Sequence, residues 1–405
     1  MNGQQWAAAF AALLVAVGAV LFALDRPGDT APMAVPNVEE VASSGIADSR
    51  YDFSRLDGNI AKMVAGPGIS GASMLIIKDG SVIFQHDYGD FTKDTVVTIG
   101  SASKWPSVLS ILMLIDKGKL GIDDKLSQYL PSFDIPDKRD ITVRQALSHM
   151  SGLPNRNDCM RNYKGTIQDC VEVISQLKLD AEPGTTFQYG SLSIQALGRV
   201  AEVVTGKPYR EYFRESLVEP LGLKNTHFGR FGKSLNPGLA GNLNTSAADF
   251  ANFLMIQLNR GDHEGKKYLS YEMVMEMEKG QTGGVPRTAH IPTRHHDTHH
   301  DLYGLGVWRD IVDEDGNVLL MSSPGKFGFV PWIDRRHNMV AVLSTEFDFR
   351  VADQSKRPEP ANVIYLVCDI IDQGTHPPVP RGEPNPRCMK YPKEAKEKLN
   401  PNPGE

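Results

Sequence analysis

The sequence lacks several patterns by which common functional classes are recognised. It has no block of Lys and Arg, and its formal net charge is −6, which argues against nucleic acid as a partner. None of its four cysteines stands in a C-x-x-C pair, and the zinc-protease pattern H-E-x-x-H is absent. No internal repeat is present. We therefore expect neither a cofactor nor a catalytic metal.

The composition is that of a globular protein whose sequence opens with a long apolar run. The 405 residues, 41% of them hydrophobic and 23% charged, are enough to bury a large core. Residues 6–24 are an unbroken apolar run, long enough to cross a bilayer. This run is either an uncleaved membrane anchor within residues 1–24 or a removed signal segment. The first five residues lack Lys and Arg and no clean cleavage site follows, which favours the anchor.

Both alternatives predict an exported protein on the periplasmic or extracytoplasmic face of the cytoplasmic membrane, where disulfides are allowed. Residues 25–50, rich in Pro, Gly and Ser, predict a flexible linker. Residues 51–375 carry the periodic patterns of one folded domain, with a helical part at about 120–260. Residues 376–405, rich in Pro, Lys and Glu, predict an extended tail.

Strand patterns fall near both ends of the folded domain, and helical patterns lie between them. The expected strands are residues 73–77, 81–85, 95–99, 302–308, 318–321, 327–333 and 339–345. The expected helices begin near residues 53, 101, 142, 194, 209, 246 and 361. This order predicts an α/β (α+β) fold with one antiparallel sheet, built from both ends of the chain and flanked by helices.

The four cysteines form an even set. Cys159 and Cys170 bracket a polar loop and could close it as a disulfide, with two free thiols as the alternative. Cys388 could likewise join the tail to Cys368.

The stretch around Ser101 carries the chemistry. Ser101 follows a strand pattern and opens an apolar helix that ends at Lys117 and Gly118. Lys104, three residues on, lies on the same helix face. A helix N-terminus adds partial positive charge, which favours oxyanion chemistry beside the hydroxyl. We predict that Ser101 is a nucleophile and Lys104 its base.

The pattern S-x-x-K is weak when it stands alone. It recurs at residues 175–178 and 323–326, and any one copy could be a capping serine followed by a solvated lysine. A second motif, residues 183–191 (PGTTFQYGS), precedes another apolar helix. Its Tyr189 could sit beside Ser101 and Lys104 and relay a proton to a leaving group, or it could be an ordinary core aromatic.

Together these stretches resemble the superfamily of serine β-lactamases and penicillin-binding proteins. Within it they are most similar to the class C-like branch of β-lactamases, D,D-peptidases and esterases. The resemblance covers most of residues 51–371 and rests on five stretches in family order. These are residues 101–104 (SASK), 142–154 (TVRQALSHMSGLP), 183–191, 217–226 (LVEPLGLKNT) and 303–306 (YGLG). It implies a Ser101 acyl-enzyme, with Tyr189 as the tyrosine of the family's Y-x-N motif.

Two motifs depart from the family pattern. Ser191 replaces the asparagine of Y-x-N, and the third motif, usually K-T-G, H-x-G or W-G-G, is ambiguous. In one register it is Lys326-Phe327-Gly328, and the Lys326 ammonium would hold a substrate carboxylate. In the other it is Ser323-Pro324-Gly325, and the Lys326 backbone N–H would be an oxyanion donor. Both registers remain open at this point.

The resemblance predicts an enzyme that cleaves a small-molecule or peptide ester or amide, with β-lactams and D-amino-acid peptides as further possibilities. The doubt over a lysine-bearing third motif favours an esterase or amidase. The alternative from another class is a non-turnover penicillin sensor or scaffold. Five histidines within residues 290–300 could bind zinc or copper incidentally, but a solvated loop explains them equally well.

Overall fold

The computed structural model describes residues 45–229, 234–287, 302–348, 360–375 and 388. The apolar run at 6–24, the histidines at 290–300 and the tail apart from Cys388 lie outside these residues. Nothing in the described ranges is a helix with the length and apolar character that a bilayer span needs.

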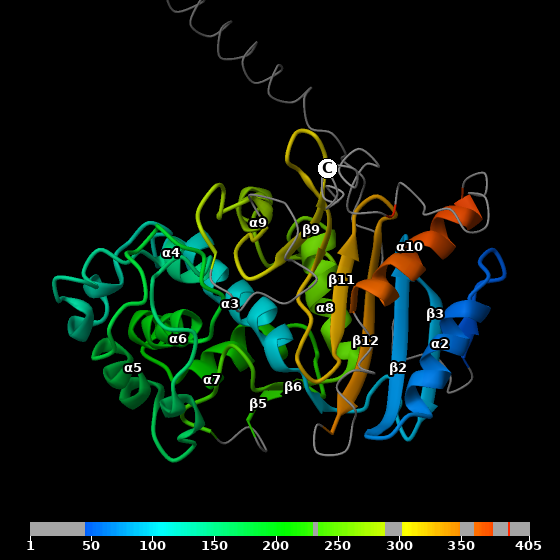
Figure 1. Cartoon of the computed structure of the whole chain (residues 1–405), viewed down its shortest axis with the longest axis horizontal. Helices are drawn as coiled ribbons and strands as arrows, with labels where there is room; N and C mark the ends of the chain where they lie inside the picture. The colour runs from blue at the N-terminus through cyan, green and yellow to red at the C-terminus, as the bar shows by residue number, and fades with distance from the viewer. Residues whose placement is uncertain (1–44, 230–233, 288–301, 349–359, 376–387, 389–405) are drawn as a thin grey trace, which may run out of the picture. The chain divides into compact units, whose positions relative to one another are not determined.

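One antiparallel sheet of seven strands joins the two ends of the domain, as predicted (Figure 1). Its order is β1-β3-β2-β12-β11-β10-β9. The early strands are β1 (Ile46–Ala47), β2 (Ile69–Lys78) and β3 (Ser81–Gly89). The late strands are β9 (Trp308–Val312), β10 (Val318–Ser322), β11 (Val330–Asp334) and β12 (Met339–Phe347). At the centre, β12 pairs with β2 from Met339 opposite Lys78 to Thr345 opposite Ala72.

The hairpin between β2 and β3 shows how local sequence sets the register. Asp79 and Gly80 both have positive φ, at 52° and 74°, as the two central residues of a tight hairpin turn require. The sheet also begins earlier than we predicted, because β1 pairs with β3 through Ile46 and Gln85. This first strand lies inside the segment that composition had marked as a linker.

Helices cover both faces of the sheet. On one face α2 (Ser54–Val64) and α10 (Pro360–Thr375) pack over a core that includes Met74 and Ile76. Their neighbours Leu75 and Ile77 point to the opposite face and join the larger core. Strand β2 is therefore buried on both faces, which explains its continuous apolar run.

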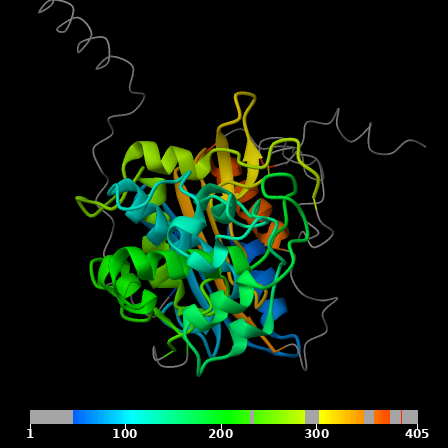
Figure 2. The same ribbon diagram turned by 90° about the vertical axis from the view of Figure 1, so that its left-hand side faces the viewer.

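The larger core is shared with the helices of the central region, which lie in front of the sheet in Figure 2. These helices are α3 (Lys104–Asp116), α4 (Val143–Leu147), α5 (Ile167–Ser175), α6 (Leu192–Thr205), α7 (Tyr209–Phe213), α8 (Ala247–Leu258) and α9 (Tyr271–Glu278). A π-helical turn, Arg214–Val218, extends α7. Thr142 and Thr166 form capping boxes at α4 and α5, and Ser246 caps α8.

Three strand predictions were too long. Residues 302–307 are irregular, with a turn in which Gly304 N donates to Val307 O, and β9 begins only at Trp308. Residues 325–328 also form a turn, so β11 begins at Val330. Of residues 95–99 only Val97–Thr98 is a strand, β4. It belongs to a separate three-stranded sheet with β6 (Leu243–Thr245) and β5 (His227–Phe228). In each case apolar alternation continues into a segment whose backbone turns. A two-stranded ribbon of β7 (Asp262–His263) and β8 (Lys266–Lys267) completes the strands of the described ranges.

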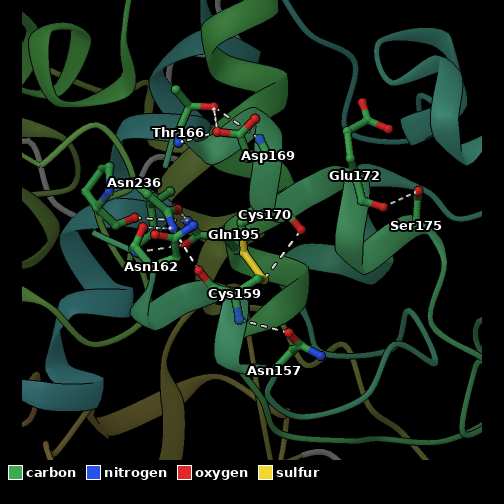
Figure 3. The surroundings of a disulfide bond; sticks show 12 residues. Asn157, Cys159, Asn162, Thr166, Asp169, Cys170, Glu172, Ser175, Gln195 and Asn236 are labelled. Carbon is green, nitrogen blue, oxygen red and sulfur yellow. Dashed lines mark hydrogen bonds between the residues drawn. A yellow bond between two sulfur atoms is a disulfide. The ribbon is translucent and has the colours of Figure 1, made fainter. Parts of the chain in front are cut away.

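Disulfides join both pairs of cysteines. Cys159, just before α5, is bonded to Cys170 within that helix (Figure 3), and Cys368 of α10 is bonded to Cys388. The first bond closes the loop that leads into α5. The second attaches Cys388 of the tail to α10.

Candidate active site

Ser101 lies in a tight turn at the N-terminal end of α3. The turn, Gly100–Ser103, is a 3-10 helix that runs directly into α3. The hydroxyl of Ser103 donates to Gly100 O at 2.7 Å and accepts from Leu243 N at 3.1 Å. Ser103 thereby ties the turn to β6. Ser101 itself is half-buried, so its hydroxyl is held by a rigid backbone yet is reachable.

Lys104 is buried and reaches Ser101. Only 1% of the residue is exposed, and its Nζ lies 3.3 Å from Ser101 Oγ and 3.0 Å from Ala240 O. The same Nζ is 4.6 Å from the centre of the Tyr189 ring. The three residues predicted to carry the chemistry are therefore neighbours. The contact to Ala240 was not foreseen, because that residue is 136 positions away in the sequence.

The segment predicted to be the third motif lies directly against the turn that holds Ser101. A Cβ added to Gly325 would be 1.8 Å from Ile99 O, and a Cβ added to Gly100 would be 2.9 Å from Lys326 N. Only glycines permit this approach, and Gly100 also has a φ of +56°. The backbone of Lys326 faces the turn that holds Ser101, while the Lys326 residue as a whole is exposed.

Phe327 and Gly328 complete the turn and lead into β11. The Phe327 carbonyl accepts from Phe347 N, and Gly328 N donates to Gly325 O. A cavity of about 610 Å³ opens beside Phe327 and is lined also by Gly68, Ile69, Ser70, Glu346, Phe347 and Asp348. Ser101, Lys104 and Tyr189 are not among the residues that line this cavity.

Tyr189 stands among aromatic side chains. Its ring centre lies 5.0 Å from that of Trp308 and 5.9 Å from that of Tyr303. Ser191, two residues after Tyr189, directly precedes α6, and its backbone N–H donates to Asn155 O at 2.7 Å. The aromatic contacts fix the Tyr189 ring, and the Asn155 contact fixes the chain that carries it.

His149 is a site residue that the sequence reasoning missed. Its ring centre is 4.7 Å from that of Tyr189, and only 1% of the residue is exposed. Burial first, and then the nearby charge of Lys104, holds the pKa of His149 well below 6.5, so the ring is neutral near neutral pH. The available signal was a lone histidine within the family-like stretch 142–154.

One cluster outside this site has the donor types of a metal centre. Atoms of Asp334, His337 and Cys368 lie within 4.8 Å of one another. However, Cys368 is bonded to Cys388, and the Arg336 guanidinium donates to both Asp334 and the Cys368 sulfur. A cation would meet an oxidised sulfur and an arginine there, so this cluster does not fit a metal ion.

Comparison with known proteins assigns the chain to a class. The family model described as Beta-lactamase matches residues 56–362, so the chain belongs to the beta-lactamase family of serine hydrolases. A candidate beta-lactamase from Bacteroides dorei DSM 17855 has a similar structure. It has a TM-score of 0.73 and 30% identity, and the match covers 80% of this chain and 100% of that one.

Two curated relatives match over shorter ranges. Protein flp of Staphylococcus aureus (strain MW2) is 31% identical over 174 residues, which are 40% of this chain and 35% of that protein. N-acetylmuramyl-L-alanine amidase of Bacillus subtilis (strain 168) is 26% identical over 260 residues, 56% of this chain and 59% of that protein. The match thus spans about a third of the first relative and three fifths of the second.

Proposed function

We propose that this protein is an exported, class C-like serine hydrolase that cleaves an ester or amide through an acyl-enzyme on Ser101. The observation that carries the proposal is the contact between Lys104 Nζ and Ser101 Oγ at 3.3 Å, in a turn that faces the third motif. A serine hydroxyl is a weak nucleophile and needs an adjacent base. Lys104 is the nearest such group among the described side chains.

The reaction follows from these positions. Ser101 Oγ attacks the substrate carbonyl carbon while its proton passes to Lys104 Nζ. The oxyanion that forms accepts hydrogen bonds from the backbone N–H groups of Ser101 and Lys326. Tyr189 then relays that proton from Lys104 Nζ to the leaving group, so both residues return to their starting protonation states. In the second half of the reaction Tyr189 helps to activate the water that releases the acyl group.

The third motif supports an ester or amide substrate over a carboxylate-bearing β-lactam. The approach of Lys326 N to Gly100 favours the register Ser323-Pro324-Gly325, which puts a serine where relatives carry lysine or histidine. Ser323 is 1% exposed, and its hydroxyl has no hydrogen-bond partner among the described residues. This position therefore offers no cation to pair with a substrate carboxylate.

Intact-mass analysis of the full chain tests the proposal. Wild type, Ser101→Ala and the control Ser175→Ala are mixed with a fluorophosphonate, with a p-nitrophenyl ester and with a penicillin. Ser175 is the matched control because it begins a second S-x-x-K, but its hydroxyl donates to Glu172 O in α5. We expect a fluorophosphonate adduct and ester turnover in wild type and Ser175→Ala, and neither in Ser101→Ala.

Other outcomes select the alternative. A lasting penicillin adduct without ester turnover would make the protein a sensor or peptidase. No adduct with any probe would refute Ser101 as nucleophile and leave a scaffold role.

The proposed export rests on the apolar run at residues 6–24 and is supported by the two disulfides, which persist in oxidising compartments. Mass analysis of the membrane and soluble extracytoplasmic fractions distinguishes the two alternatives. An uncleaved anchor gives full-length protein in the membrane fraction, and a removed signal gives a shorter protein in the soluble fraction. Reduced, uncleaved protein found only in the cytoplasm would contradict export.

A further inference from the structure

The carbonyl that accepts from Lys104 belongs to a segment without regular secondary structure. Ala240 lies between β5 and β6, in a loop that the structure describes at residue 229 and again from residue 234. Asn236, Leu239 and Ala240 are nevertheless buried, at 1%, 0% and 2% exposed. Because no strand partner holds this loop, its buried backbone groups need other partners. The place of the Ala240 carbonyl depends on those partners.

Gln195 supplies them from the neighbouring helix α6. Its side chain is fully buried, and its amide makes three hydrogen bonds to the loop. The Gln195 Nε2 donates to Asn236 Oδ1 at 2.8 Å and to Pro237 O at 3.1 Å, and Oε1 accepts from Leu239 N at 3.2 Å. One side chain thus holds the loop on both sides of residue 238, directly ahead of Ala240.

Two further contacts complete the attachment. One turn along α6, a Cβ added to Gly198 would be 2.7 Å from Leu239 Cδ2, so the helix and the loop are in close contact. The Leu239 carbonyl accepts from Ser107 Oγ at 2.8 Å, one turn beyond Lys104 on α3. The loop therefore bridges α6 and the helix that carries the lysine.

Asn236 connects the same loop to the disulfide (Figure 3). Its Nδ2 donates to Cys159 O at 2.9 Å and to Asn162 O at 3.2 Å, both within the segment that Cys159 and Cys170 close. A continuous set of hydrogen bonds and chain contacts therefore runs from the partly exposed disulfide loop through the buried Asn236 and Gln195 to the acceptor of Lys104.

We propose that Gln195 and Asn236 are positioning residues for Lys104. They hold the Ala240 carbonyl where it orients the Lys104 amine toward Ser101, and they couple that orientation to the Cys159–Cys170 loop. The proposal rests on the function proposed above. Misplacing a catalytic group by about 1 Å can cost on the order of a hundredfold in rate. Loss of the Gln195 amide should therefore slow acylation by about ten- to a hundredfold.

The test measures the second-order rate of fluorophosphonate labelling of Ser101 in the full chain. Gln195→Leu removes the amide. If the leucine variant does not fold, Gln195→Glu takes its place, because glutamate keeps the side-chain volume and the acceptor for Leu239 N–H. Tyr268→Phe is the matched control. It removes a buried hydroxyl that donates to Pro220 O at 2.9 Å, and its ring neighbours His263 and Lys266 instead of the site. Each variant is assayed at the same interval below its own Tm.

We expect Gln195→Leu to label at least about tenfold more slowly than wild type, with Tyr268→Phe within about twofold. If Gln195 affects the rate only by positioning Lys104, replacing Gln195 should have little effect once Lys104 has been removed. In a Lys104→Ala background, Gln195→Leu should therefore change the residual rate by less than about twofold. A merely structural role would slow both backgrounds equally.

Replacing Cys159 and Cys170 together by serine tests the coupling. The coupling is supported if the double serine variant labels more slowly than wild type and if the same replacement causes no further slowing in Gln195→Leu. Labelling of Gln195→Leu at the wild-type rate, or an equal loss in the Lys104→Ala background, would overturn the positioning role. Failure of wild type to label would instead refute the proposed function, so the two failures are distinguishable.

Discussion

Acidification should destabilise this protein through one buried histidine beside the candidate active site. His149 is 1% exposed, and neither ring nitrogen has a hydrogen-bond partner among the described residues. The rings of Phe187, Tyr189 and Tyr303 surround it, and the Lys104 amine lies nearby. Protonation would bury a cation among aromatic rings, with no hydrogen-bond partner for either ring nitrogen among the described residues.

The sign and size of the effect follow from proton linkage. The folded-state pKa of His149 lies well below 6.5, its ordinary value, whereas the unfolded chain takes up the proton near that value. Below pH 6.5 the unfolded state therefore binds more protons, and stability falls as the pH falls, until the folded-state pKa is reached. One group contributes about 1.4 kcal/mol per pH unit. The loss attributable to His149 therefore grows at this rate as the pH falls below 6.5, until the folded-state pKa is reached.

Urea unfolding of wild type and His149→Asn at about pH 7.5, 6 and 5 measures this loss. Asparagine suits the position because residue 149 has a φ of +60°, which asparagine tolerates better than most residues. His227→Asn, at a half-buried position in β5, is the control and should keep the wild-type pH dependence. Equal acid losses in wild type and His149→Asn would refute the reasoning. The difference between them isolates His149 from His263, whose pKa burial also lowers.

Three further changes have expected outcomes. Replacing Cys159 and Cys170 by serine should lower the free energy of unfolding by about 3 kcal/mol, since the closed loop spans 11 positions; an unchanged Tm by calorimetry would count against this. Arg335→Met should lower the free energy of unfolding in urea by about 3 kcal/mol, because it leaves the Glu278 carboxylate, whose side chain is 3% exposed, with Arg260 as its ion-pair partner and the neutral Gln257 amide as a further donor; a neutral result would mean that these two partners compensate fully. Gly58→Ala should stabilise α2 by about 0.5–1 kcal/mol, because the added Cβ meets no atom within 4 Å; a lower urea midpoint would contradict that account.

Much of the fold could be predicted because its signals are local. The hairpin at residues 79–80, the caps at Thr142 and Ser246, and the apolar periodicity of α3 each depend on residues close together in the sequence. The errors were local as well. Residues 302–307 alternate as a strand does, but a turn interrupts them before β9.

Only the residues of the candidate site that lie in short sequence motifs could be predicted. Ser101 and Lys104 stand on one helix face, so their contact follows from spacing alone. Ala240 contacts Lys104, and Gln195 contacts the loop that carries Ala240, through tertiary contacts that no short-range pattern encodes, since a backbone carbonyl carries no sequence signature. The register of the third motif likewise depends on the approach of residues 325 and 326 to the Ser101 turn.

The pairing of β2 with β12 has a consequence for how the chain folds. Strand β12, which pairs with β2, begins at Met339, so more than 250 residues separate the two strands in the sequence. Contacts this far apart in sequence close late, and they slow folding. During synthesis β2 would present an unpaired edge until nearly the whole chain had been made. We expect a chain that ends before Met339 to stay unfolded. Such a delay would suit the export proposed above, in which the polypeptide crosses a membrane before it folds.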